Sequence, residues 1–174
     1  MATGDIFIRE LGPEDFDEFY RLRLHGLVHH ARSFWETADE FEAKPKEEQV
    51  KRLTESYTAD DKFILGAFEG TELIGIVGFS REGGAKGRHR GSIWGMYVHT
   101  DHQGKRIGTK LLHAAIERAR NIADMEVLFL FVAPENAPAL TLYTSCGFKS
   151  YGIEPYSMKL NGKFYEEEMM YLKL

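Results

Sequence analysis

The sequence predicts a mixed α/β fold, with a central sheet of about seven mostly antiparallel strands flanked by four helices. Two apolar runs, residues 93–98 and 126–133, enclose an amphipathic helix that is expected to extend to about Ala123. A strand–helix–strand unit of this length implies a right-handed crossover and a parallel pair of strands. Two hairpin signals, Glu69-Gly70-Thr71-Glu72 and Asn161-Gly162, predict antiparallel pairing elsewhere.

A short strand and two helices are expected before the first hairpin. The strand covers Ile6–Arg9, and Pro13 then opens a helix because proline fits the first helical turn. His29 and His30 are expected on the surface of this helix. A second helix should run from about Pro45 to Tyr57. The apolar stripe of the first helix follows a three- and four-residue spacing and consists of Phe16, Tyr20, Leu24, Leu27 and Ala31.

The remaining elements alternate between buried strands and helices. Residues 63–68 and 73–79 form the hairpin strands, and the strand at 90–98 should be central because its inner part is apolar on both faces. After the strand at 126–133, Asn136 is expected to cap a short helix that ends at Gly147. The last two strands begin near Phe148 and at Phe164, the second ending at Leu172, and no linker divides residues 1–174, which we expect to form one domain.

Composition excludes several classes of protein. The chain has 174 residues, 43% of them hydrophobic, which suits a globular core. Its formal net charge of −5 argues against general nucleic-acid binding, and no apolar run is long enough to span a membrane. The lone cysteine, Cys146, rules out an intrachain disulfide, and the histidines lack zinc-ligand spacing, so no metal is expected. With no signal-peptide pattern at Met1–Asp5, these features predict a cytoplasmic protein that binds neither nucleic acid nor membrane.

The segment between the strand at 90–98 and the following helix predicts an anion site. A glycine-containing turn before a helix directs several backbone N–H groups, and the positive end of the helix dipole, at one point. Glycine lets a ligand approach the backbone closely because it has no Cβ. His102, Lys105, Arg106 and Lys110 add positive charge to a chain that is acidic overall. Phosphate is the most natural ligand of such a turn.

Two motifs resemble those of the GNAT superfamily of N-acetyltransferases. That family has a Gln/Arg-x-x-Gly-x-Gly/Ala turn after its fourth strand, and Gln103 and Gly108 fit its first and last positions, while Arg106 replaces the middle glycine. Residues 136–148 match a second family pattern, Asn-x-x-Ala-x-x-Leu-Tyr-x-x-x-Gly-Phe, at every position. The element order agrees over essentially the whole chain. The resemblance implies a GNAT-like fold in which the fourth and fifth strands form a parallel, splayed pair.

The resemblance also implies acetyl-coenzyme A as the acetyl donor. Its pantetheine arm is expected to pair with the exposed backbone of Met96, Tyr97 and Val98. Asn136 and Ala139 should border the arm, and Tyr143 should reach the thioester sulfur. The residues expected to bind the pyrophosphate are those of the turn, Gln103, Gly104, Lys105, Arg106, Ile107, Gly108 and Thr109.

The expected mechanism is direct attack of an amine on the thioester, with Tyr143 as the acid that protonates the leaving thiolate. Some family members use a glutamate of the fourth strand as the base, but residues 90–94 contain no carboxylate. The base is therefore unassigned, with Glu36 and Glu135 as candidates that are each better explained as solvated acids. Cys146 is interpreted as a packing residue because it precedes the glycine that ends a helix.

The acceptor is expected to bind between residues 34–41, which form an irregular loop, and residues 156–165. Aromatic and acidic side chains in the first segment, including Phe34, Trp35, Glu36 and Asp39, favour a cationic small-molecule amine. A protein N-terminus or lysine is the alternative acceptor, and a non-catalytic coenzyme A sensor is the alternative from another class. We expect a monomer or a homodimer.

Overall fold

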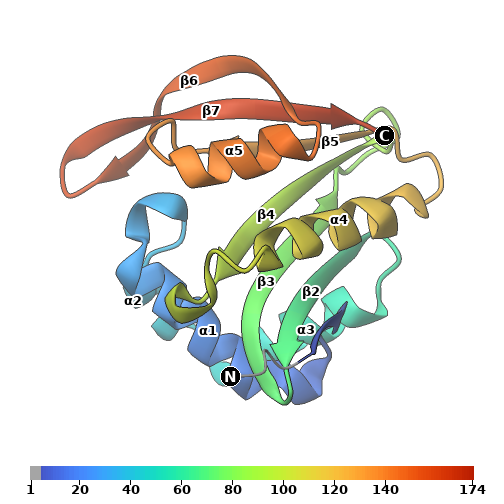
Figure 1. Ribbon diagram of the computed structural model, residues 1–174, viewed down its shortest axis with the longest axis vertical. Helices are drawn as coiled ribbons and strands as arrows, with labels where there is room; N and C mark the ends of the chain where they lie inside the picture. The colour runs from blue at the N-terminus through green and yellow to red at the C-terminus, as the bar shows by residue number, and fades with distance from the viewer. Residues whose placement is uncertain (1–4) are drawn as a thin grey trace.

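The computed structural model describes residues 5–174, so Met1–Gly4, on which part of the signal-peptide prediction rests, lie outside the described residues. Seven strands form one sheet in the order β1-β2-β3-β4-β5-β7-β6 (Figure 1). Only β4 and β5 are parallel among the described strands, so the predicted mixed sheet is confirmed. The strands are β1 (Ile6–Glu10), β2 (Lys62–Glu69), β3 (Glu72–Arg81), β4 (Arg90–Val98), β5 (Val127–Val132), β6 (Lys149–Leu160) and β7 (Lys163–Lys173).

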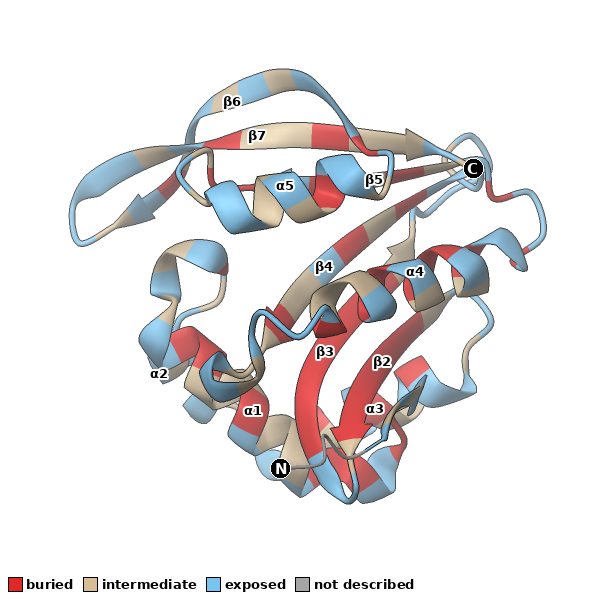
Figure 2. Ribbon diagram, viewed as in Figure 1, coloured by how far each residue is buried: buried red, intermediate tan, exposed pale blue. Residues whose placement is uncertain are grey.

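The helices cover both faces of this sheet. The helix α4 crosses one face over β2, β3 and β4, while α1 and α3 lie on the opposite face (Figure 1). Covered on both sides, β2 and β3 are buried along most of their length (Figure 2). No helix of residues 5–174 is long and apolar enough to cross a membrane. The helices are α1 (Phe16–His29), α2 (Ala38–Glu42), α3 (Lys46–Thr58), α4 (Ile107–Arg120) and α5 (Ala137–Ser145).

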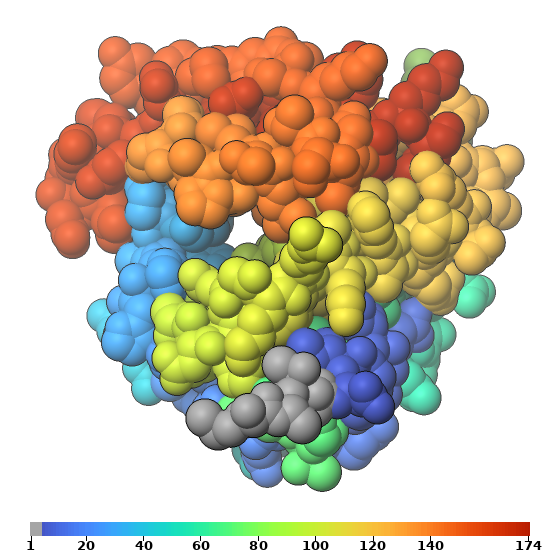
Figure 3. All heavy atoms as spheres, viewed as in Figure 1, coloured from blue at the N-terminus to red at the C-terminus, as the bar shows by residue number. Residues whose placement is uncertain are grey.

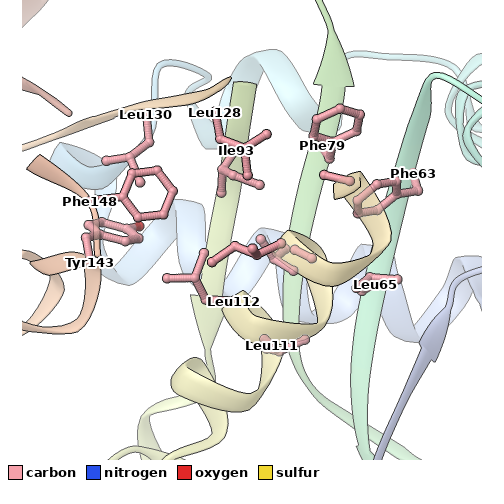
Figure 4. Close-up of a cluster of buried hydrophobic side chains, with 14 of the residues drawn as sticks. Phe63, Leu65, Phe79, Ile93, Leu111, Leu112, Leu128, Leu130, Tyr143 and Phe148 are labelled. Atoms are coloured by element: carbon pink, nitrogen blue, oxygen red, sulfur yellow. The ribbon is translucent and has the colours of Figure 1, made fainter. Parts of the chain in front are cut away.

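The larger core cluster lies between the sheet and α4. Phe63 of β2 stacks on Phe79 of β3 with ring centroids 4.7 Å apart, and Leu111 and Leu112 of α4 are completely buried beside them (Figure 4). Burying side chains of this size contributes roughly 1.5–3 kcal/mol each. The predicted amphipathic character of this helix is therefore confirmed, and the buried face of α4 packs against the sheet.

Three local predictions need correction. The helix α1 ends at His29, and Ala31 lies exposed in a separate 3-10 turn, so it is not part of the buried stripe. Leu22, which was not predicted, is completely buried. Residues 33–46 are less irregular than expected because they contain α2. A capping box starts α2, in which Thr37 Oγ1 accepts a hydrogen bond from Glu40 N at 3.1 Å and Glu40 Oε2 accepts one from Thr37 N at 2.9 Å.

The two parallel strands separate soon after they meet. Only Arg90–Ser92 of β4 pair with Val127–Phe129 of β5. From Ile93 onward β4 pairs only with β3, and Gly95 bends it at a φ of +62°. Meanwhile β5 continues along β7 to Val132. The edge of β4 that faces β5 is therefore left unpaired over residues 93–98, which confirms the predicted splayed pair.

Candidate active site

A cavity of about 660 Å³ fills the space between the separated strands. In Figure 3 the surface is hollowed between α5, the segment that precedes α4 and the light-blue segment around α2. Its walls therefore come from both motifs of the sequence and from the loop after α1. The lining side chains and backbone groups used below are His30, Phe34, Trp94, Met96, Tyr97, Val98, Gln103, Gly104, Arg106, Ile107, Gly108, Thr109, Asn136, Ala139, Tyr143 and Glu167.

Twelve of the thirteen residues predicted to bind the donor border this one cavity. The exception is Lys105, which is exposed in the turn and does not line it. The residues come from three places in the chain, namely the unpaired end of β4, the turn into α4, and α5. These residues are separated in the sequence, and the fold brings them to one cavity. The resemblance implied the same arrangement.

The turn before α4 is tied to the end of β4 and contains two residues with left-handed backbones. Gln103 Nε2 donates a hydrogen bond to the carbonyl oxygen of Val98 at 3.0 Å, which ties the turn to the end of β4. Gly104 and Arg106 both have left-handed backbones, with φ of +77° and +60°. Arg106 thus adopts the conformation that a glycine would adopt freely, at a cost of about 1–2 kcal/mol for a residue with a Cβ. Its side chain does not cap α4, so the first N–H groups of the helix have no side-chain acceptor there.

Gly108 of α4 lies against side chains of α5 and β4. A Cβ at this position would lie 3.2 Å from Leu142 Cδ2 and 3.3 Å from Met96 Cε, which is tighter than usual contact. The absence of a side chain therefore allows α4, α5 and β4 to meet. It also leaves the N-terminal backbone of α4 accessible from the cavity.

Tyr143 projects from α5 into the wall of the cavity. Asn136 caps this helix, since its Oδ1 accepts a hydrogen bond from Ala139 N at 3.2 Å, as the sequence predicted. The ring of Tyr143 is 9% exposed and packs against Phe148 at a centroid distance of 6.0 Å (Figure 4). Burial raises the pKa of Tyr143 to about 12, because desolvation disfavours the phenolate. The hydroxyl therefore keeps its proton at neutral pH.

The two carboxylates that sequence analysis considered as bases lie outside the cavity lining. Glu36 forms ion pairs with Lys44 and, at 3.4 Å, with Arg23. Glu135 pairs with Arg32 at 3.0 Å. Cys146 does not border the cavity either, and burial raises the pKa of its thiol, which suits the predicted packing role.

Sequence reasoning missed Glu167, a carboxylate that does border the cavity. It lies in β7, is only 5% exposed, and accepts hydrogen bonds at Oε2 from Trp35 Nε1 at 3.0 Å and from Ser157 Oγ at 2.7 Å. A signal was present in the run Glu166-Glu167-Glu168. In a strand, alternate residues share a face, so one of three consecutive acids must point away from the other two.

The predicted acceptor segments contribute less than expected. Phe34 borders the cavity, but Tyr156 is 75% exposed, and no residue of 156–165 is part of the lining. His30, expected on a helix surface, also borders the cavity, and its Nε2 is buried without a hydrogen-bond partner among residues 5–174. Those same residues contain no cluster of histidine, cysteine and acidic side chains arranged to hold a metal.

Comparison with known proteins identifies the family of this chain. A model of the acetyltransferase (GNAT) family matches residues 24–148. The spermidine N(1)-acetyltransferase of Vibrio cholerae is 30% identical over 84 residues, or 48% of this chain and 49% of that protein. The N-alpha-acetyltransferase RimI of Mycobacterium tuberculosis is 33% identical over 103 residues, or 56% and 59%. The matches thus span about half the length of these curated relatives.

The fold is also that of a solved structure with a bound donor. The yncA protein of Salmonella typhimurium, solved with its cofactor acetyl-CoA, superposes with a TM-score of 0.85 at 23% identity, covering 98% of this chain and 95% of that one. This likeness concerns the fold. Because the family model covers more than half of the sequence, and both family motifs line the same cavity, the chain belongs to the acetyltransferase (GNAT) family.

Proposed function

We propose that the protein is an N-acetyltransferase that moves the acetyl group of acetyl-coenzyme A to a primary amine of a small molecule. The observation that carries this proposal is the shared cavity, which joins an unpaired strand edge, a helix N-terminus and a protonated phenol. The family relationship supports the donor, as does the acetyl-CoA bound in yncA.

The residues fit the donor in three respects. The helix N-terminus at Ile107–Thr109, with Arg106 beside it, suits a pyrophosphate. The free edge of β4 at Met96–Val98 offers backbone groups to the amide-containing pantetheine arm, as an added strand would use them. Asn136 and Ala139 form the facing wall.

The proposed reaction is a direct transfer. Bound acetyl-coenzyme A supplies an activated acetyl group. The neutral amine nitrogen forms a bond to the acetyl carbon, the carbon–sulfur bond breaks, and one proton of the nitrogen ends on the sulfur. An amine with a pKa of about 10.4 must first lose its ammonium proton to solvent. The role assigned to Tyr143, which is protonated and in the cavity wall, is to give its proton to the leaving sulfur and to regain one from the nitrogen.

A small-molecule acceptor is preferred over a protein because the end of the cavity near Glu167 is walled by side chains. Phe34 and Glu167, both buried, are part of that wall. The named relatives support both kinds of acceptor, since one is a spermidine N(1)-acetyltransferase and the other is an N-alpha-acetyltransferase.

The test is thiol release from acetyl-coenzyme A with a panel of acceptors, namely ethylamine, spermidine and a peptide with a free N-terminus. We expect the small amines to give the higher kcat/KM. Turnover with the peptide alone would favour the protein acceptor. Tight coenzyme A binding without thiol release on any amine would favour the sensor and contradict an enzyme.

A further inference from the structure

We propose that Glu167 is the subsite at which the amino group of the acceptor first binds in its protonated form, before it loses that proton to solvent and attacks, and that Glu167 makes the protein selective for basic aliphatic amines. This inference rests on the proposed function and adds a substrate class to it. It concerns a residue of β7, outside both sequence motifs.

Glu167 is a carboxylate placed in the interior of the protein. It is 5% exposed, whereas Glu166 beside it is exposed, so the alternation of β7 turns Glu167 alone of the two inward. Two neutral donors hold it, the indole N–H of Trp35 and the hydroxyl of Ser157, and both contact Oε2. The other oxygen, Oε1, receives no hydrogen bond from any residue of the described chain.

The charge of this carboxylate has no cationic partner among the described residues. No lysine, arginine or histidine nitrogen in residues 5–174 lies within 4.0 Å of it. Arg32, from the loop after α1, instead pairs with Glu135 and donates to the backbone oxygen of Glu166 at 2.6 Å. An ionised carboxylate that is buried without a cation is costly, and a cation that enters the cavity removes part of that cost.

The surroundings suit an ammonium ion better than a second carboxylate or a neutral group. The attraction comes from the carboxylate, because the face of Phe34, which borders the same cavity, is already covered by the Arg23 guanidinium at 4.6 Å. Aliphatic amines carry a proton at neutral pH, and an ammonium group has three donors for the free Oε1. Trp35 and Ser157 act as positioning residues, since each donates to the oxygen that the ligand does not use.

The experiment measures binding and transfer with two amines of the same carbon skeleton. Ethylamine is protonated at pH 7, whereas trifluoroethylamine is a weak base and mostly neutral. Binding is followed by NMR titration of the protein saturated with coenzyme A, in which transfer cannot occur, and kcat/KM is measured separately with acetyl-coenzyme A. The variants are Glu167→Gln, the matched neighbour Glu166→Gln, and His30→Gln at another polar position of the cavity.

We expect Glu167→Gln to weaken ethylamine binding by about tenfold or more, as for loss of a hydrogen bond to a charged group. It should change trifluoroethylamine binding and coenzyme A affinity by less than about twofold. The control Glu166→Gln should leave both amines unchanged. The proposal would be overturned if Glu167→Gln weakened the binding of both amines equally or left ethylamine binding unchanged. It would also be overturned if only His30→Gln removed the preference for ethylamine over trifluoroethylamine. If Glu167→Gln does not fold, Glu167→Asp, which keeps the charge but retracts it, must weaken ethylamine selectively.

The two proposals fail in different ways. A wild-type protein that binds ethylamine through Glu167 but releases no thiol with any amine would refute the enzyme and keep the subsite. A protein that acetylates both amines alike, with and without Glu167, would keep the enzyme and refute the subsite.

Discussion

Replacing Tyr143 by phenylalanine isolates one hydroxyl at the proposed reaction centre. The ring is buried against Phe148, and no residue among the described ones hydrogen-bonds to the hydroxyl. Tyr143→Phe should therefore keep the packing and change the free energy of unfolding at pH 7 by less than about 1 kcal/mol. Any large decrease in turnover is then caused by the loss of the hydroxyl.

The expected size of that effect follows from the acidity of the group. With its pKa raised to about 12, Tyr143 is a weaker acid than a thiol, whose ordinary pKa is about 8.5. Complete proton transfer to a solvated thiolate would be uphill. Burial in the cavity disfavours the thiolate for the same reason that it disfavours the phenolate. The pKa of the thiol therefore rises as well, and the gap between the two pKa values narrows. We expect Tyr143→Phe to lower kcat by about 10²-fold, which corresponds to about 2.7 kcal/mol of transition-state stabilisation.

The assay is kcat for thiol release at saturating acetyl-coenzyme A and amine, with donor affinity measured by calorimetry on both proteins. Donor affinity should stay nearly unchanged. Because the phenol keeps its proton to about pH 11, the wild-type enzyme should show no loss of kcat from this group below that pH. A variant within about twofold of wild type, when chemistry limits the rate, would reduce Tyr143 to a packing residue and leave protonation to water.

Three further changes test the proposed phosphate site, the cap of α5 and an ion pair between Arg9 and Asp15. Gly108→Asp should weaken acetyl-coenzyme A binding by about tenfold or more in calorimetry, because it adds a negative charge and a Cβ 3.2 Å from the wall; unchanged affinity in a folded variant would refute the phosphate assignment. Asn136→Ala should lower the free energy of unfolding by about 1 kcal/mol through loss of the cap, measured by urea titration, while Asn136→Asp should restore most of it. The Arg9 guanidinium holds the pKa of the Asp15 carboxyl below its usual value. As the pH falls, Asp15 is therefore protonated in the unfolded chain before it is protonated in the folded protein. The stability that the ion pair contributes is lost below about pH 4. Asp15→Asn should therefore be less stable than wild type at pH 7, with a gap that narrows toward pH 2; a gap independent of pH would contradict this.

The parts of the site that could be predicted depend on short-range chemistry. Asn136 and Gly147 each perform a role that the next few residues define, namely a helix cap and a left-handed helix end at φ +94°. The capping box at Thr37 and Glu40 was equally readable, but the aromatic and acidic side chains around it suggested a loop, and α2 was missed. The central position of β4 followed from its apolar pattern on both faces.

The acceptor end of the cavity could not be predicted in the same way, because its charge depends on pairing between distant segments. Glu36 and Glu167 are the same residue type, and the sequence places Glu36 among more acids and aromatics. In the fold, Arg23 of α1 and Lys44 neutralise Glu36. Glu167 instead accepts hydrogen bonds from a tryptophan that is 132 positions away in the sequence and from a serine that is 10 positions away. A count of local charges therefore favours Glu36, which is paired and lies outside the cavity lining, over Glu167, which borders the cavity. Only the tertiary structure distinguishes a paired acid from one that is buried and available, and this difference decides which residue an ammonium ligand can use.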